Sequence, residues 1–123
     1  MDTKELGNLG ERLACEYLVE KGFKVVGTNY RITFGEIDII ASKKNVIHFI
    51  EVKTIATNSG GFFPEQHVNY KKQRKLRQMA QIYLEKNNYK QNQAYQIDII
   101  GIIANQETRN AKLHYFPNAV GGG

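Results

Sequence analysis

The feature that most restricts the fold of this chain is a run from Gly35 to Lys53, in which ionisable side chains interrupt two strongly apolar segments. The segments are rich in Ile and Val, and a short polar stretch separates them, which is the pattern of two strands joined by a turn. Burying a charge costs free energy unless a partner compensates it. Three carboxylates in this run, Glu36, Asp38 and Glu51, therefore need a partner, and a divalent cation is the simplest one.

Strand alternation predicts how these side chains are arranged. The predicted elements are a strand at 37–41, a turn at 42–45 and a returning strand at 46–53. Because side chains alternate between the two faces of a strand, a turn with an even number of residues puts Glu36, Asp38, Glu51 and Lys53 on one face. Asp38 then lies opposite Phe49, and its carboxylate is a diagonal neighbour of Glu51, about 7 to 8 Å away at the backbone. The alternative interpretation is a charged strand end exposed to solvent.

Asp38, a spacer and then Glu51-Val52-Lys53 resemble the signature of the PD-(D/E)XK nuclease superfamily. The wider set of motifs resembles the small bacterial YraN-like family, which is similar to the archaeal Holliday junction resolvases. These motifs are Gly7-Asn8-Leu9-Gly10-Glu11, Asn29-Tyr30-Arg31, Gly35-Glu36-Ile37-Asp38, Phe49-Ile50-Glu51-Val52-Lys53-Thr54, and Val68 followed by Lys72-Gln73-Arg74. The resemblance covers nearly the whole chain. It implies an α/β fold with a restriction-endonuclease-like αβββαβ core, a mixed sheet flanked by helices.

The resemblance also implies a chemistry, the hydrolysis of phosphodiester bonds in DNA, including branched DNA, with Mg²⁺ or Mn²⁺ as cofactor. Asp38 and Glu51 would hold the ion. Lys53 would orient the attacking water or stabilise charge on the phosphorane, and Glu36 would tune the local field. A symmetric homodimer would suit a branched substrate with two-fold symmetry.

Glu11 belongs to a first helix that the apolar spacing predicts over residues 3–21. On a helical projection it lies at the edge of the apolar stripe, where a surface glutamate is an equally good interpretation. In resolvase-like members of the superfamily, a Glu in the first helix completes the metal site. Glu11 is the matching position, so the resemblance implies that it assists the metal.

A second helix is predicted to begin near Asn69, because apolar residues recur at helical spacing after a run of basic ones. Five cations fall within seven residues: Lys71, Lys72, Arg74, Lys75 and Arg77. A solvated charged face is the common role of such a run. Because few acids balance it and the chain carries a net charge of +5, we expect this face, together with Arg31, to bind the phosphates of nucleic acid.

Two positions depart from the family pattern. Ile55 stands where the family has Arg after the Lys-Thr pair, and Gln96-Ile97 precedes Asp98 where the family has Arg-Phe. These departures favour an alternative function, a non-catalytic nucleic-acid-binding module that retains the nuclease fold. A third hypothesis is an adaptor whose basic helix binds an acidic protein.

The rest of the sequence predicts one domain over residues 1–120 and a flexible glycine tail at 121–123, because 123 residues can bury one core without disulfides. One cysteine excludes an internal disulfide, and the spacing of the three histidines indicates no zinc site. No apolar run reaches the roughly 20 residues that span a bilayer, and no signal peptide opens the chain, so we expect a cytoplasmic protein without a membrane partner.

Further strands are predicted at 23–30, 94–104 and 112–116, with a long polar loop at 54–67. The strand that contains Asp98 returns after a helix, so we expect it to pair in parallel with a member of the hairpin. Asp98 sits between isoleucines, which suits a supporting or structural acid better than a metal ligand.

Overall fold

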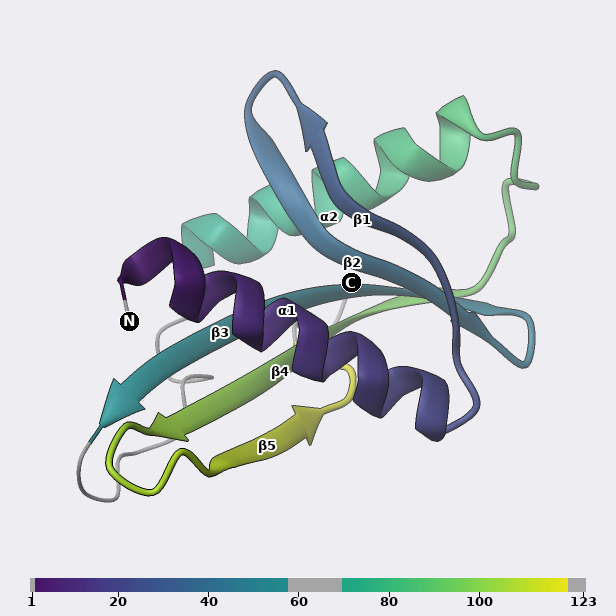
Figure 1. The fold of residues 1–123 in the computed structure, drawn as a ribbon. Helices are drawn as coiled ribbons and strands as arrows, with labels where there is room; N and C mark the ends of the chain where they lie inside the picture. Colours follow the sequence, from purple (N-terminus) through teal and green to yellow (C-terminus); the bar gives the residue numbers. More distant parts are fainter. Residues whose placement is uncertain (1, 58–69, 120–123) are drawn as a thin grey trace.

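The computed structural model describes residues 2–57 and 70–119. Seven elements follow one another in the order α1 (Thr3–Glu20), β1 (Lys24–Ile32), β2 (Gly35–Lys43), β3 (Val46–Thr57), α2 (Tyr70–Lys86), β4 (Tyr95–Asn105) and β5 (Ala111–Phe116). Figure 1 shows these elements along the chain. Within the described ranges, no helix is long and apolar enough to cross a membrane.

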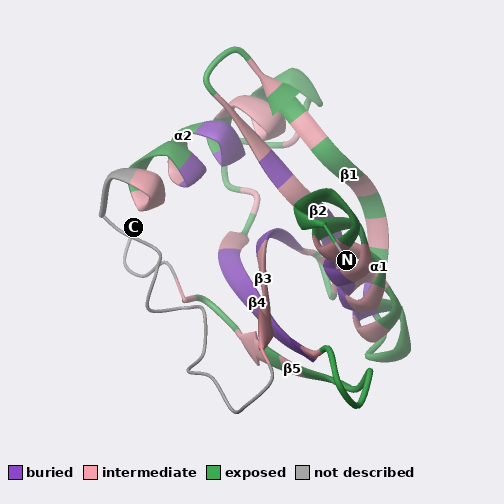
Figure 2. Cartoon of the chain, turned by 60° about the vertical axis from the view of Figure 1, so that its left-hand side comes forward, coloured by how far each residue is buried: buried purple, intermediate pink, exposed green. Residues whose placement is uncertain are grey.

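The five strands form one mixed sheet in the order β1-β2-β3-β4-β5. β3 and β4 are parallel, whereas the other neighbouring pairs are antiparallel. The parallel pairing confirms the expectation for the strand that contains Asp98. α1 crosses one face of the sheet and α2 lies on the other side (Figures 1 and 2). The α/β class and the mixed sheet with flanking helices are therefore confirmed.

Each helix covers its own hydrophobic core. Ala14 and Leu18 of α1 pack on one side of the sheet with Ile39, Ile50 and Ile100. On the other side, α2 contributes Leu76, Met79 and Ala80, which pack against Ile37, Ile40, Phe49, Ile97 and Ile99. This apolar layer on both faces explains why the central strands read as nearly continuous Ile and Val runs rather than as alternating ones.

The β2–β3 turn is shorter than the sequence predicted. Lys44 and Asn45 alone form it, with φ angles of 50° and 65°, and Lys43 pairs with Val46. A two-residue hairpin turn of this kind needs positive φ at both central positions, and the usual Asn-Gly signal for it is absent here. The predicted four-residue turn was therefore wrong. The turn length is still even, but Phe49 pairs with Ile40 in this register, so Asp38 does not lie opposite Phe49.

Several element bounds also differ from the prediction. β3 continues to Thr57 because it stays paired with β4 as far as Asn105, so the polar loop expected from residue 54 begins later. β1 extends past the predicted end at residue 30 to Ile32, where it pairs with Gly35. The remainder of the predicted loop and the glycine tail lie outside the described residues.

β2 separates from β3 near Asp38. Its pairing with β3 stops at Ile39 and Ile50, whereas its pairing with β1 continues to the hairpin turn. Ile37 packs in the core under α2 and Ile39 in the core under α1, although residues two apart on a flat strand face the same side. β2 therefore twists sharply at Asp38, and Figure 1 shows the β1–β2 hairpin bending away from the plane of β3 and β4.

Candidate active site

Asp38 occupies the gap that opens where β2 leaves β3. Its Oδ2 accepts a hydrogen bond of 2.8 Å from the backbone N–H of Val52 in β3. A backbone N–H needs an acceptor when it is removed from water, and beyond Ile50 the strand partner has moved away. The carboxylate therefore takes the position that the backbone of β2 would hold in a continued ladder.

Three other acids act on Asp38. The pKa of Asp38 is raised from 3.8 to about 7. Burial is the largest cause and the charge of Glu51 the next, whereas the hydrogen bond from the Val52 N–H acts to lower the pKa. Glu11 and Glu36 add smaller contributions in the same upward direction. Glu51, Glu11 and Glu36, which come from β3, α1 and β2, are thus each close enough to Asp38 to act on its charge. They converge on the gap from different elements and do not lie on one flat face, because the strand twists.

Glu11 reaches this gap because α1 approaches the sheet closely one residue earlier. A Cβ atom on Gly10 would lie 1.9 Å from Oγ1 of Thr54 in β3, so only glycine fits there. Burial raises the pKa of Glu11 and the charge of Glu36 raises it further, while a side-chain hydrogen bond with Asn29 lowers it. Glu11 therefore faces the acid cluster and is not an isolated surface glutamate.

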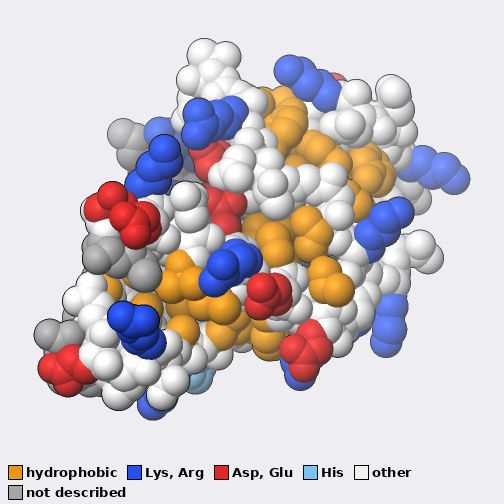
Figure 3. Space-filling view, viewed as in Figure 1, with side chains coloured by type: hydrophobic (Ala, Val, Ile, Leu, Met, Phe, Trp, Pro, Cys, Tyr) orange, Lys and Arg blue, Asp and Glu red, His pale blue; other side chains and the backbone are white. Residues whose placement is uncertain are grey.

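Two cations touch the cluster. Lys72 Nζ of α2 lies 2.5 Å from Glu51 Oε1, and Arg31 Nε donates a hydrogen bond of 2.9 Å to Glu36 Oε2. Lys53 is half-buried and makes no ion pair with the residues that the structure describes. The cation beside Glu51 is thus Lys72 and not Lys53. Figure 3 shows acidic side chains recessed between Lys and Arg side chains on this face.

The basic residues of α2 divide into two groups. Lys72 is half-buried and turned toward the acids, whereas Arg74 and Lys75 are exposed. Arg77 is half-buried, and the side chain of Lys71 lies outside the described residues. The uniform positive face predicted for this helix is therefore incomplete, because one of its cations already has a carboxylate partner.

The acid cluster offers oxygen ligands that suit a hard divalent cation. Mg²⁺ is commonly held by one or two carboxylates and retains several waters. Asp38 and Glu51 fit that requirement, since the charge of Glu51 raises the pKa of Asp38 and a cation between the two carboxylates would offset that effect. Within residues 2–57 and 70–119, no three Asp, Glu, His or Cys side chains are arranged to hold an ion together. The chemistry thus fits a two-carboxylate site, with Glu11 and Glu36 nearby.

Asp98 lies in a separate polar network on the α1 side of the sheet. The side chain is fully buried and accepts four hydrogen bonds, from His48 Nδ1, Tyr115 Oη, Gln96 Nε2 and the backbone N–H of Asn118. Burial alone would raise the pKa of Asp98, but the bonds from His48 and Tyr115, with the two others, hold it below 3.8. Asp98 therefore has the surroundings of a structural acid.

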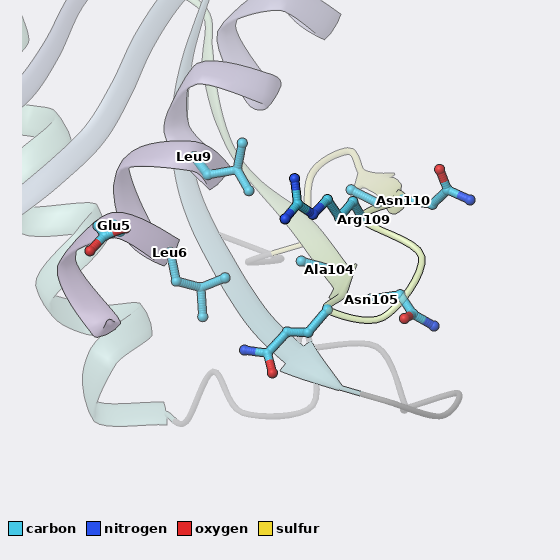
Figure 4. A pocket seen from close by; sticks show the side chains of 9 residues that line it. Glu5, Leu6, Leu9, Ala104, Asn105, Arg109 and Asn110 are labelled. Carbon is cyan, nitrogen blue, oxygen red and sulfur yellow. The ribbon is translucent and has the colours of Figure 1, made fainter. Parts of the chain in front are cut away.

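A hollow of about 540 Å³ lies away from the acids, between the first half of α1 and the β4–β5 turn. Leu6 and Leu9 line it from the helix, and Arg109 and Asn110 line it from the turn (Figure 4). None of the four clustered acids contributes to its lining. We place the candidate site at the acids because reactive groups, rather than volume, determine chemistry.

Sequence reasoning missed three contributors to the site. The Val52 N–H and the Asn29 side chain hold Asp38 and Glu11, and no local pattern indicates either contact. Phe34 is 42% exposed in the β1–β2 turn beside the acids and α2. A large aromatic residue in a turn between two strands was a signal that could have identified it.

Comparison with known proteins places this arrangement in a family. Residues 10–102 match the model of the uncharacterised protein family UPF0102. A UPF0102 protein of Alkaliphilus metalliredigens is 41% identical over 117 residues, which are 95% of this chain and 98% of that protein. Relatives from Dictyoglomus turgidum and Caldanaerobacter subterraneus are 39% and 40% identical, each over 97% of this chain and over 99% and 97% of their own lengths. The chain therefore belongs to the UPF0102 family, whose members are the YraN-like proteins.

Proposed function

We propose that this protein is a metal-dependent DNA endonuclease with a restriction-endonuclease-like core, and that branched DNA is among its substrates. The observation that carries the proposal is the environment of Asp38. Asp38 is half-buried at the strand gap, and its pKa is raised to about 7 by burial and by three neighbouring acids. A strongly perturbed acid with specific charged neighbours is typical of functional sites.

The residues around Asp38 would have different roles. Asp38 and Glu51 would hold Mg²⁺ or Mn²⁺, with Glu11 assisting, and Glu36 would keep the local field negative. When bound, the metal would polarise a phosphate oxygen and lower the pKa of a coordinated water. Lys72 already reaches Glu51 and can donate to a phosphate oxygen instead. Lys53, on the same strand two residues from Glu51, would orient the attacking water.

The exposed cations would hold the DNA backbone. Arg74 and Lys75 lie on the solvent side of α2, and Arg31 extends from β1 with 78% of its side chain exposed. Cations that face solvent can replace the counterions of DNA phosphates, which makes binding sensitive to salt. A symmetric homodimer would place two such surfaces around a branched junction.

The alternative function is a nucleic-acid-binding module without catalysis. Two observations favour it. Lys72 already neutralises Glu51, and Ile55 packs in β3 beside Ile103, where the family pattern has an arginine. In this case DNA binding would persist without metal and without cleavage.

The test compares wild type with Asp38→Asn. This substitution preserves size but removes one anionic ligand, so we expect weaker Mg²⁺ binding by calorimetry and no cleavage of linear, flapped or four-way DNA. Glu20→Gln, at an exposed position of α1, is the control for loss of one negative charge and should behave as wild type. If wild type binds DNA but cuts none of these substrates with Mg²⁺ or Mn²⁺, the binding module is the correct function. Equal cleavage by Asp38→Asn and wild type would show that the site is misplaced.

A further inference from the structure

The β1–β2 turn presents an aromatic ring next to the acid cluster. Thr33 and Phe34 form the turn between the paired residues Ile32 and Gly35, and Phe34 remains 42% exposed. The Phe34 ring therefore stays accessible to a partner beside the charged residues of β2 and α2. In Figure 1 the β1–β2 hairpin crosses α2, and its turn extends beyond the helix.

A hollow of about 360 Å³ separates Phe34 from the basic residues of α2. Leu76 and Met79 give it an apolar floor, and Lys72 and Lys75 also line it. The hairpin lies tightly on this floor, because a Cβ on Gly35 would be 2.8 Å from Met79 Sδ. The volume is within the range of small-ligand sites, roughly 300 to 1,000 Å³.

The chemistry of this lining matches one nucleotide. An aromatic face and a thioether floor accept a flat ring, and two ammonium groups accept the phosphates on either side of it. Glu36 also lines the hollow, and a carboxylate accepts hydrogen bonds from amino groups of bases. Lys72 pairs with Glu51 and Glu36 pairs with Arg31 in the unbound protein, so a nucleotide can exchange these contacts for its own phosphates and amino groups, which a purely apolar partner cannot do.

We propose that this hollow binds one unpaired nucleobase, stacked on Phe34, while Lys72 and Lys75 hold the flanking phosphates. The inference rests on the proposed function, since it defines the substrate class of the same site. A paired base inside a duplex is covered by its neighbours and cannot reach Phe34. The site therefore selects nucleic acid that has an unpaired base within about one nucleotide of the phosphate at Asp38, as at a branch point, a bulge or a single-stranded end.

The first experiment uses a fluorescent reporter. The chain contains no tryptophan, so Phe34→Trp introduces a single indole at the proposed stacking position. The titration uses an oligonucleotide duplex with one bulged base, without divalent metal so that nothing is cut. We expect the bulged base to quench the indole emission, and the same duplex with an abasic residue at the bulge to bind without that quenching.

The second experiment measures affinity. Phe34→Ala should weaken binding of the bulged duplex by about ten- to a hundredfold and leave binding of the continuous duplex unchanged. Removing the bulged base from the duplex should weaken its binding by wild type by a similar factor. It should not weaken binding by Phe34→Ala any further, because both changes remove the same contact. Val19→Ala, at a valine on α1 that is 60% exposed, is the matched control and should bind as wild type.

Two failures are distinguishable. If wild type binds bulged and continuous duplexes equally, and Phe34→Ala does the same, the base site is refuted while DNA binding by the basic residues stands. Quenching of the Phe34→Trp indole by the abasic duplex as strongly as by the bulged one would refute it as well. If wild type binds no nucleic acid at all, both the base site and the proposed function are wrong.

Discussion

Asp98, which is fully buried, and Asp38, which is half-buried, belong to one sheet, yet their surroundings differ in the features that set a pKa. Asp98 accepts four hydrogen bonds and has a lowered pKa. Asp38 accepts a hydrogen bond from Val52, has three acids as neighbours, and has its pKa raised to about 7. Burial raises the pKa of both carboxyl groups, so the difference comes from their partners.

The difference indicates which of the two carboxylates can interact with a ligand. The donors around Asp98 satisfy it within the protein, so its charge stabilises the fold and is not available to a ligand. The neighbours of Asp38 leave its charge poorly compensated, so an external cation or a proton can lower the free energy of that region. A buried carboxylate alone therefore indicates little, whereas one surrounded by like charges indicates a binding site.

The largest expected effect comes from making the same substitution at both positions. Asp98→Asn replaces an ionised acceptor with a neutral amide whose NH₂ group cannot accept, so we expect a loss of roughly 2 kcal/mol or more in the free energy of unfolding at neutral pH. Asp38→Asn should leave that free energy unchanged or raise it. Urea denaturation of both variants measures the difference. Equal destabilisation by the two substitutions would remove the distinction between them.

The pH dependence of stability should also separate the two aspartates. The folded-state pKa of Asp38 is about 7 and the usual value is 3.8, so the folded protein binds the extra proton more tightly than the unfolded chain. The resulting stability is fully present below pH 3.8 and is lost as the pH rises toward about 7. The contribution of Asp98 to stability depends on pH in the opposite direction, because its pKa in the folded protein is lowered. This contribution is present at pH values above the usual pKa of Asp and is lost in acid.

We therefore expect Asp38→Asn to unfold with nearly wild-type free energy at about pH 4 and to exceed wild type by about 1 to 2 kcal/mol above about pH 7. Denaturation at a series of pH values, without divalent metal, measures this. Glu20→Gln, at an exposed position of α1, is the control for the loss of one carboxylate. A constant difference between Asp38→Asn and wild type across this range would show that Asp38 titrates normally.

Much of the fold could be predicted from the sequence because local patterns determine it. The apolar stripe of α1, the Ile-rich strands and the periodicity of α2 identified the elements, and the helix between β3 and β4 predicted their parallel pairing. The exact register could not be predicted, because Lys44 and Asn45 adopt positive φ without a glycine to indicate it. The resemblance to a family, rather than spacing, pointed to Glu11.

The candidate site was less predictable because its contacts join distant segments. Strand alternation placed Lys53 on the face of Glu51, but it gave no sign that α2 brings Lys72 into an ion pair with Glu51. No pattern along the chain indicates that residues 21 positions apart, at 51 and 72, make an ion pair. The Val52 N–H is available to Asp38 only because β2 separates from β3, which is a property of the assembled sheet.

The smallest expected effect concerns Lys72, the cation that pairs with Glu51 in the described part of the chain. Lys72→Met keeps much of the side-chain volume but removes the ammonium group beside Glu51, which is 9% exposed at its side chain. Because Lys72 itself is 35% exposed and water screens the pair, we expect a loss of only about 1 kcal/mol in the free energy of unfolding. The exposed Lys75→Met is the control and should change it by less than about 0.5 kcal/mol.

The same variant sharpens the contrast with Asp98, because it makes the Asp38 cluster more negative without touching the Asp98 network. Mg²⁺ no longer competes with the ammonium group for Glu51, so calorimetry should show tighter Mg²⁺ binding by Lys72→Met than by wild type. DNA binding should weaken and its salt dependence should flatten by about one unit of log-log slope, since one phosphate contact is lost. If Lys72→Met binds Mg²⁺ more weakly than wild type, then Lys72 positions Glu51 as a metal ligand instead of competing with the metal for it. The acids around Asp38 would then be held by partners within the protein, as Asp98 is.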